Sequence, residues 1–242
     1  METPNAPSER RFIGIKQIDK PVGLRLGKLS KVVFVPHHDP KQGVLVLSQD
    51  RLLSKWQASQ QTNDFSIGRS DKETTNDIEF RDEAISPNHL RVTHGANHFY
   101  SVEDRGSMNG TFEEQVTEVH GEVSVQNNEW AFTSLAKQPT LQIGPTLVRV
   151  ETTGDKTYIV AGRRRIEISE GVPFTIGAGA NNNLSIGEMQ GNPFNRATLV
   201  YFNQMVFINS SDKPISIREQ NPGATTQSQE AARKGVLLEQ AL

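Results

Sequence analysis

Short apolar segments that alternate with polar residues run through most of the chain and argue against a fold built from long helices. Gly, Asn, Asp and Pro separate these segments. Runs of this length that are rich in Val, Ile and Phe are typical of strands in a β-sandwich or barrel. The sequence therefore predicts an all-β protein whose strands each bury one face. The clearest examples are residues 31–35, 43–47, 65–67, 90–92, 146–150, 158–160, 165–168, 198–202 and 205–208.

The composition narrows the classes of protein to consider. The 242 residues carry a formal net charge of −2 and contain no cysteine. Disulfides and thiolate metal sites are therefore excluded, and the near-neutral charge argues against binding to nucleic acid or anionic lipid. No stretch approaches the roughly 18 apolar residues of a membrane span, so we expect no direct membrane insertion. The polar N-terminus does not resemble a signal peptide, and we expect a cytoplasmic protein.

An internal repeat divides the chain. Residues 65–68 (FSIG) reappear as residues 174–177 (FTIG), and an Asn-containing loop and a short strand follow each copy. A turn-forming sequence after residue 150 lies between the copies and predicts a domain boundary there. We therefore expect an N-terminal extension over 1–41 that adds strands, a first domain over 42–150, a second over 151–218, and a polar tail over 219–242 that forms a loop or a short helix.

Four short motifs follow one another in the first half. They are Ile67-Gly68-Arg69, Asn76-Asp77-Ile78, Ser86-Pro87-Asn88-His89 and Ser107-Met108-Asn109-Gly110-Thr111. In this order they resemble the forkhead-associated (FHA) domain family, whose pattern contains Gly-Arg, Asn-Asp-Ile, Ser-x-x-His and Ser-x-Asn-Gly-Thr. Leu141-Gln142-Ile143-Gly144 closes the series, so the resemblance covers residues 42–150. It implies an FHA-type β-sandwich of eleven strands whose loops at one end bind phosphothreonine peptides.

The chemistry of three motif residues fits phosphopeptide binding. A phosphorylated side chain carries about two negative charges and three strong acceptor oxygens, which are best met by a guanidinium and neutral donors. Arg69 supplies the guanidinium, Ser86 a hydroxyl donor, and Asn109 an amide that can clamp the peptide backbone. Structural alternatives remain for each residue: a surface salt bridge for Arg69, and turn formation for the other two.

Four further motif residues are expected to support these loops. Gly68 and Gly110 permit backbone angles that a β-carbon would forbid. The resemblance implies that His89 forms hydrogen bonds within the loops and holds Ser86 in place, and that Thr111 is a further support. A general-base role for His89 is disfavoured, because no nucleophile or acidic partner is patterned around it.

Two positions depart from the family pattern. Met108 stands where the family usually has Thr or Ser, and its thioether cannot donate a hydrogen bond to phosphate. Pro87 stands where Arg or Asn is common. Pro87, Met108 and Arg105 are therefore uncertain contacts, and either Arg105 or Arg91 is a candidate to compensate for the lost donor.

The second half keeps the strand pattern but lacks the phosphate-binding residues. Ala178 stands where the first half has Arg69, and no Ser-x-x-His follows Ile186. We expect a degenerate FHA-like domain that folds as a sandwich, does not bind phosphate and forms any interface through its loops. Two weaker features have plain interpretations: a solvated hairpin turn at residues 163–165 (RRR), and an exposed loop, not a metal site, at residues 37–38 (HH).

These features predict a binding protein, not an enzyme, that uses neither a cofactor nor a metal. The leading interpretation is a phosphothreonine-dependent adaptor in Ser/Thr kinase signalling, whose partner is a Thr-phosphorylated protein such as the kinase or its substrate. The alternative is a phosphate-independent structural subunit of a larger assembly, such as a bacterial secretion apparatus. Nucleic acid is not an expected partner, and the sequence does not fix the oligomeric state.

Overall fold

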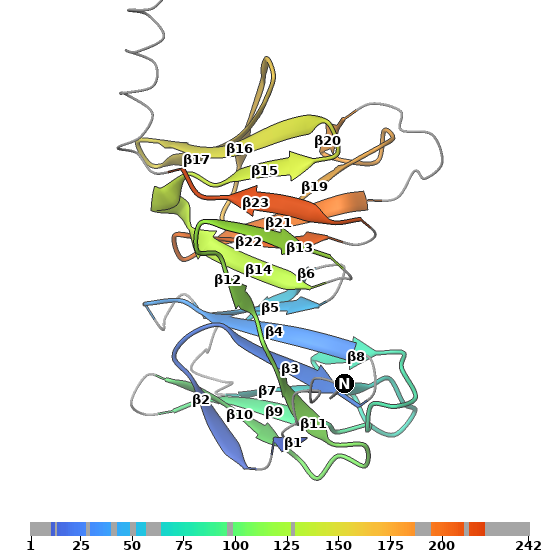
Figure 1. The fold of residues 1–242 in the computed structure, drawn as a ribbon. Coiled ribbons are helices and arrows are strands. Elements are labelled where there is room, and N and C mark those ends of the chain that lie inside the picture. Colours follow the sequence, from blue (N-terminus) through green and yellow to red (C-terminus); the bar gives the residue numbers. More distant parts are fainter. Residues whose placement is uncertain are drawn as a thin grey trace, which may run out of the picture.

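The computed structural model describes residues 11–12, 14–27, 30–39, 43–48, 52–56, 64–95, 99–126, 129–186, 195–210 and 213–220 (Figure 1). Nearly all elements in these ranges are strands, and the helical element among them is one 3-10 turn, η2 (Leu135–Lys137). The all-β prediction is confirmed, and every segment expected to be extended lies in a strand apart from Gly43, which directly precedes β5. Within the same ranges, no helix has the length and apolar character that crossing a membrane requires.

The first part of the chain forms a sandwich of two sheets. Sheet A contains, in spatial order, β1 (Arg11–Phe12), β11 (Thr111–Glu114), β3 (Val22–Leu26), β4 (Ser30–Pro36), β5 (Val44–Ser48) and β6 (Leu52–Trp56). Sheet B contains β2 (Ile15–Ile18), β10 (Tyr100–Asp104), β9 (Leu90–His94), β7 (Asp64–Arg69) and β8 (Ile78–Phe80). Alternate apolar side chains of both sheets fill the core between them, as strands with one face turned inward require.

The second part of the chain repeats this architecture. Sheet C contains β12 (Thr117–Glu118), β14 (Trp130–Ser134), β22 (Met205–Ser210), β21 (Asn195–Phe202), β19 (Pro173–Gly177) and β20 (Leu184–Ser185). Sheet D contains β13 (Glu122–Val125), β23 (Ile215–Arg218), β15 (Thr140–Ile143), β16 (Thr146–Thr153), β17 (Lys156–Ala161) and β18 (Arg164–Ile168). Apart from the added β12, the order of strands in sheets C and D matches the order in sheets B and A.

The sequence repeat coincides with this structural repeat. β7 pairs in parallel with β8, and β19 pairs in parallel with β20, from the corresponding isoleucines Ile67 and Ile176 onward. In the first sandwich, the Asp77 carboxylate accepts hydrogen bonds from both the N–H and the hydroxyl of Ser66. The Asn183 side chain makes the same pair of contacts with Thr175 in the second sandwich. The two copies of the FxIG motif therefore begin the same parallel strand pair.

The boundary between the sandwiches lies between Glu114 and Thr117, so the expected boundary after residue 150 is wrong. The turn at residues 154–155 joins β16 to β17, which pair over five residue positions within sheet D. Residues 11–36 contribute strands to the first sandwich, as expected, although β1 to β4 are integral strands and not an addition to a domain that begins at residue 42. Likewise, residues 122–150 complete the second sandwich and not the first. The expected loop or helix after residue 220 lies outside the described residues.

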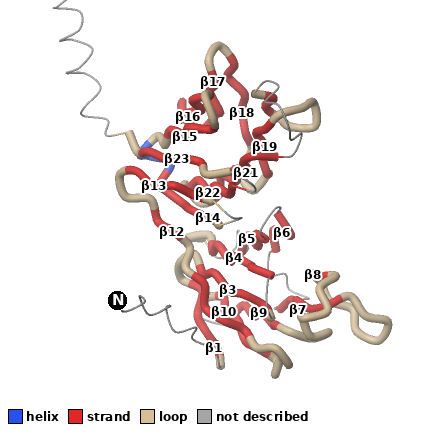
Figure 2. Tube along the Cα trace, turned by 45° about the vertical axis from the view of Figure 1, so that its right-hand side comes forward, coloured by secondary structure: helices blue, strands red, loops and turns tan. Residues whose placement is uncertain are grey.

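Sheet A of the first sandwich packs against sheet C of the second, as Figures 1 and 2 show. The Trp130 indole N–H donates a hydrogen bond to the Ser48 carbonyl oxygen across this junction at 2.5 Å. The expectation that an interface would use loops is therefore wrong: β4, β5, β21 and β22 bury apolar side chains on both faces. The junction consists of Val33, Val35, Leu45 and Leu47 from sheet A, and Trp130, Val200, Phe202 and Phe207 from sheet C.

The two adjacent histidines expected in an exposed loop lie at the edge of this junction. The His37 ring packs edge-on against Phe202 with 5.3 Å between ring centroids. The Asn203 side chain contacts the His38 ring and donates a hydrogen bond to the Pro36 carbonyl oxygen at 3.2 Å. The loop is therefore a point of contact between the sandwiches, although the His38 side chain remains exposed.

Candidate phosphopeptide-binding site

The three expected ligand-binding residues lie on loops that meet at one end of the first sandwich. Arg69 ends β7, Ser86 lies between β8 and β9, and Asn109 lies between β10 and β11. The Arg69 N–H donates a hydrogen bond to the Ser86 carbonyl oxygen at 3.0 Å. The Met108 N–H donates to Ser86 Oγ at 2.9 Å, and Asn109 Nδ2 donates to the Ala84 carbonyl oxygen at 2.9 Å. The β8–β9 loop is therefore bonded directly to Arg69 on one side and to the β10–β11 loop on the other.

The Arg69 guanidinium faces a polar pocket. Its Nη2 atom lies 3.8 Å from the Asp71 carboxylate, and the Arg69 side chain is 34% exposed. An ion pair this long and this exposed contributes little to stability, so it leaves the guanidinium available for a ligand. The pocket has a volume of about 320 Å³ and is lined by Arg69, Asp71, Ser70, Arg81 and Glu83.

Gly68 is required because another loop passes very close to it. A β-carbon at this position would lie 2.0 Å from the Pro87 carbonyl oxygen. That oxygen accepts a hydrogen bond from Asn76 Nδ2 at 2.6 Å, which holds the β8–β9 loop against β7. The requirement at Gly68 is thus for space, whereas Gly110 adopts a φ of +78° and meets the expected requirement for backbone freedom.

His89 is fully buried and connects Ser86 to β11. Its Nδ1 atom accepts a hydrogen bond from the Ser86 N–H at 3.1 Å, which places the imidazole proton on Nε2. Nε2 then donates to Thr111 Oγ1 at 3.1 Å, and the Thr111 hydroxyl donates to the Asp104 carboxylate at 2.6 Å. Burial lowers the pKa of His89 despite the opposing charge of Asp104, so the imidazole is held neutral.

Asp104 begins the last motif segment and is a supporting residue to which the sequence analysis gave no role. One carboxylate oxygen accepts the N–H groups of Gly106 and Ser107, at 2.9 and 2.7 Å, and the other accepts the Ser107 hydroxyl at 2.7 Å. Burial alone would raise the pKa of Asp104, but hydrogen bonds from Ser107 and Thr111 and the nearby His89 outweigh burial and lower it. An Asp two residues before a Gly is a common turn signal, because its side chain can accept the N–H two residues on, and it could have identified this residue.

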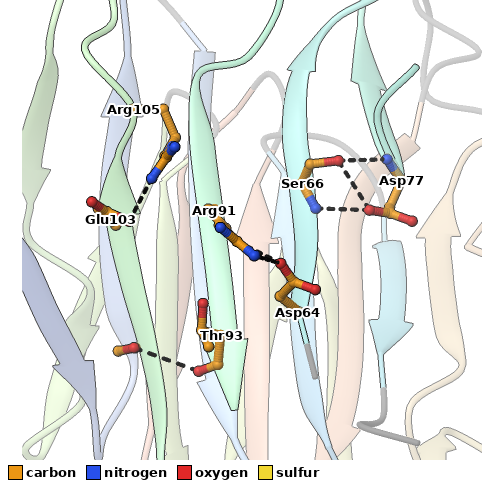
Figure 3. A network of polar contacts seen from close by, with 8 residues as sticks. Asp64, Ser66, Asp77, Arg91, Thr93, Glu103 and Arg105 are labelled. Atoms are coloured by element: carbon orange, nitrogen blue, oxygen red, sulfur yellow. Dashed lines mark hydrogen bonds and ion pairs between the residues drawn. The ribbon is translucent and has the colours of Figure 1, made fainter. Parts of the chain in front are cut away.

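Of the three uncertain contacts, Arg105 lies apart from Arg69, whereas the Pro87 carbonyl oxygen lies next to Gly68. The Met108 side chain is 87% exposed, so only its backbone N–H contributes to the site. Figure 3 shows that Arg105 donates to Glu103 on the outer face of sheet B, at 3.2 Å, and that Arg91 contacts Asp64 there. Both arginines line a separate depression of about 210 Å³ and not the pocket at Arg69.

The corresponding loop of the second sandwich keeps the supporting contact without the guanidinium. Asn182 Nδ2 donates to the Ala178 carbonyl oxygen at 3.0 Å. Asn76 Nδ2 approaches the Arg69 carbonyl oxygen in the same way, at 3.3 Å, in the first sandwich. The next loop, at residues 187–194, lies outside the described residues. The second sandwich thus repeats this supporting contact, but it has the uncharged Ala178 where the first sandwich has Arg69.

Acid is expected to destabilise these loops by protonating His89. Because its pKa in the folded chain is below the usual value of about 6.5, the unfolded chain binds more protons between the two values. The contribution of neutral His89 to the free energy of unfolding is therefore fully present above about pH 6.5, and it is lost as the pH decreases below that value. Protonation would also turn Nδ1 into a donor that faces the Ser86 N–H. The measurement is the melting temperature by circular dichroism from about pH 8 to about pH 5.

His37 sets the control for this experiment. Burial also lowers the pKa of His37, so it contributes a change of the same sign at the junction. The His37→Gln variant removes that contribution, and its melting temperature should still fall in acid. An unchanged melting temperature of His37→Gln across this range would contradict the assignment to His89.

Comparison with known proteins agrees with this geometry. The family model of the FHA domain matches residues 65–129. The chain matches no curated protein and no solved structure. FHA domains are phosphothreonine-dependent protein-interaction modules. The matched segment begins at β7 and contains the loops that carry Arg69, Ser86 and Asn109, so this chain contains an FHA domain.

Proposed function

We propose that this chain is an adaptor that binds Thr-phosphorylated proteins at the loop end of the first sandwich. The main support is that Arg69, Ser86 and Asn109 lie on three segments joined by hydrogen bonds through the β8–β9 loop. Together they offer a guanidinium, a hydroxyl and an amide to a phosphate and its peptide. Ser86 Oγ accepts its hydrogen bond from Met108, so the hydroxyl proton is available to a phosphate oxygen.

The proposal places the protein downstream of a Ser/Thr kinase in the cytoplasm. The partner is a phosphorylated substrate of that kinase or the kinase itself. The role is binding and not catalysis, because His89, the nearest potential base to Ser86, is buried and bonded through both ring nitrogens. Its Nδ1 atom faces the Ser86 backbone N–H and not the hydroxyl, so it does not activate a nucleophile.

A peptide-library titration of the full chain tests this proposal. The library carries a central phosphothreonine with randomised neutral flanks, and matched libraries carry phosphoserine or unmodified threonine. We expect binding to phosphothreonine and none to unmodified threonine. The family resemblance further implies weaker binding to phosphoserine, which lacks the methyl group. Equal binding of the phosphorylated and unmodified libraries would overturn the proposal.

A second candidate function is phosphate-independent docking in a larger assembly. It is favoured by Met108, which presents an exposed thioether without a donor proton beside the site. In this case the partner is recognised by shape, and treating it with a phosphatase leaves binding unchanged. The same treatment should abolish binding if the first proposal holds.

A further inference from the structure

We propose that Arg81 is a second phosphate-binding guanidinium and acts on the same phosphate as Arg69. This inference rests on the proposed function, because it concerns how the ligand phosphate is held. It assigns a binding role to a residue outside the four FHA motifs.

The loops offer fewer donors to a phosphate than the family pattern does. Met108 has no side-chain donor, and Pro87 has neither a side-chain donor nor a backbone N–H. A phosphate carries between about 1.5 and 2 negative charges at neutral pH, and Arg69 neutralises only one of them. The remaining charge would be removed from water without a protein group to pair with it, and such desolvation costs free energy. A second cation at the pocket would supply that partner.

Two of the arginines considered as replacements are engaged elsewhere. Arg105 is bonded to Glu103 and Arg91 to Asp64, both on the outer face of sheet B (Figure 3). Turning either one toward the Arg69 pocket would break an existing ion pair. The depression that they line is separate from that pocket.

Arg81 lies beside Arg69 because of the parallel pairing of β7 with β8. This pairing sets Arg69 opposite Phe80, the residue before Arg81. The Ser70 N–H donates to the Phe80 carbonyl oxygen at 2.8 Å, which fixes the start of the following loop next to β7. Both guanidinium-bearing side chains line the 320 Å³ pocket. Arg81 is exposed, and within the described part of the chain it forms no ion pair.

The charged residues that line the pocket are two cations and two anions. Asp71 and Glu83 line it together with the two arginines, so the empty pocket is balanced. Such a balance limits repulsion between the two guanidinium groups when no ligand is bound. At about 30 Å³ per water-sized group, the volume admits a phosphate together with bridging waters.

The experiment compares Arg81→Gln with wild type, using the phosphothreonine library with neutral flanks and fluorescence anisotropy. We expect Arg81→Gln to weaken binding roughly tenfold or more, as loss of a hydrogen bond to a charged group does, and Arg81→Lys to keep part of the affinity. Arg105→Gln is the matched control, because it also removes an exposed arginine from this sandwich, and it should bind as wild type. Circular dichroism melting of each variant separates loss of binding from loss of folding.

The outcomes distinguish this inference from the proposed function. If wild type binds the library and Arg81→Gln binds it equally well, Arg81 does not contact the phosphate and the inference is overturned. The inference is also overturned if Arg81→Gln weakens binding only of peptides that bear Asp or Glu beside the phosphothreonine. In that case Arg81 contacts the flanking acidic residue and not the phosphate. If wild type binds no phosphorylated library, both the proposed function and this inference are overturned.

Discussion

Replacing Arg69 by alanine is expected to abolish phosphopeptide binding while leaving the first sandwich folded. Arg69 offers the ligand a charge-assisted pair of hydrogen bonds, and losing such a contact typically costs about 2–5 kcal/mol. Affinity should therefore fall by roughly thirtyfold or more. The fold should survive, because the side chain is partly exposed and its ion pair with Asp71 is long.

Calorimetric titration with a single phosphothreonine peptide measures this loss, and Arg69→Lys serves as its matched variant. Lysine keeps the charge but lacks the planar fork, so its affinity should lie between those of wild type and Arg69→Ala. The backbone N–H of residue 69 still donates to Ser86 in both variants, so the loops remain joined. Binding of the peptide by Arg69→Ala with wild-type affinity would remove Arg69 from the site.

The strands and the candidate site could be predicted from the sequence because both depend on local patterns. Alternating apolar residues set which face of each strand is buried, and each motif is a short local sequence, as in the turn that Asp104 and Ser107 close. Even so, the role of Gly68 was not visible locally. The space that it provides is filled by the Pro87 carbonyl from another loop.

The assignment of strands to the first or the second sandwich could not be predicted in the same way. Residues 24–27 (LRLG) and 141–144 (LQIG) share one pattern, and both end in a glycine with positive φ. They occupy matching places, in β3 of sheet A and β15 of sheet D. Either segment has the inward-facing apolar residues that the first sandwich needs. The FHA match itself runs past β11 to residue 129. Inward patterning alone therefore left the boundary undetermined.

The outward faces of the next strands separate the two possibilities. On β4, Val33 and Val35 point away from the first core and are buried at the junction with sheet C. The corresponding positions on β16 carry Arg149 and Glu151, which pair with each other at 3.2 Å on the surface. If β16 occupied the place of β4, these two charges would enter the apolar junction, at a high desolvation cost. Therefore β4, and not β16, occupies this place in sheet A, which is covered on both faces.

At this junction, Val35→Glu should destabilise the protein strongly. Val35 is fully buried between sheets A and C, so the new carboxylate would lie among apolar side chains without a cation. An uncompensated buried charge typically costs about 3–5 kcal/mol. The matched control is Glu151→Val, which makes the reverse exchange on the exposed outer face of sheet D. A surface change of this kind should alter the free energy of unfolding by no more than about 0.5 kcal/mol.

Two readouts follow Val35→Glu, because the chain can respond by unfolding or by separating its sandwiches. Urea denaturation followed by circular dichroism measures the free energy of unfolding, and small-angle X-ray scattering measures the radius of gyration in native buffer. Separation would expose Trp130, Phe202 and Phe207, so a larger radius should coincide with stronger binding of a hydrophobic dye. Wild-type stability together with a wild-type radius in Val35→Glu would show that sheets A and C do not pack together. In that case the apolar outward face of β4 would need another partner, since a strand with two apolar faces is stable only when both are covered.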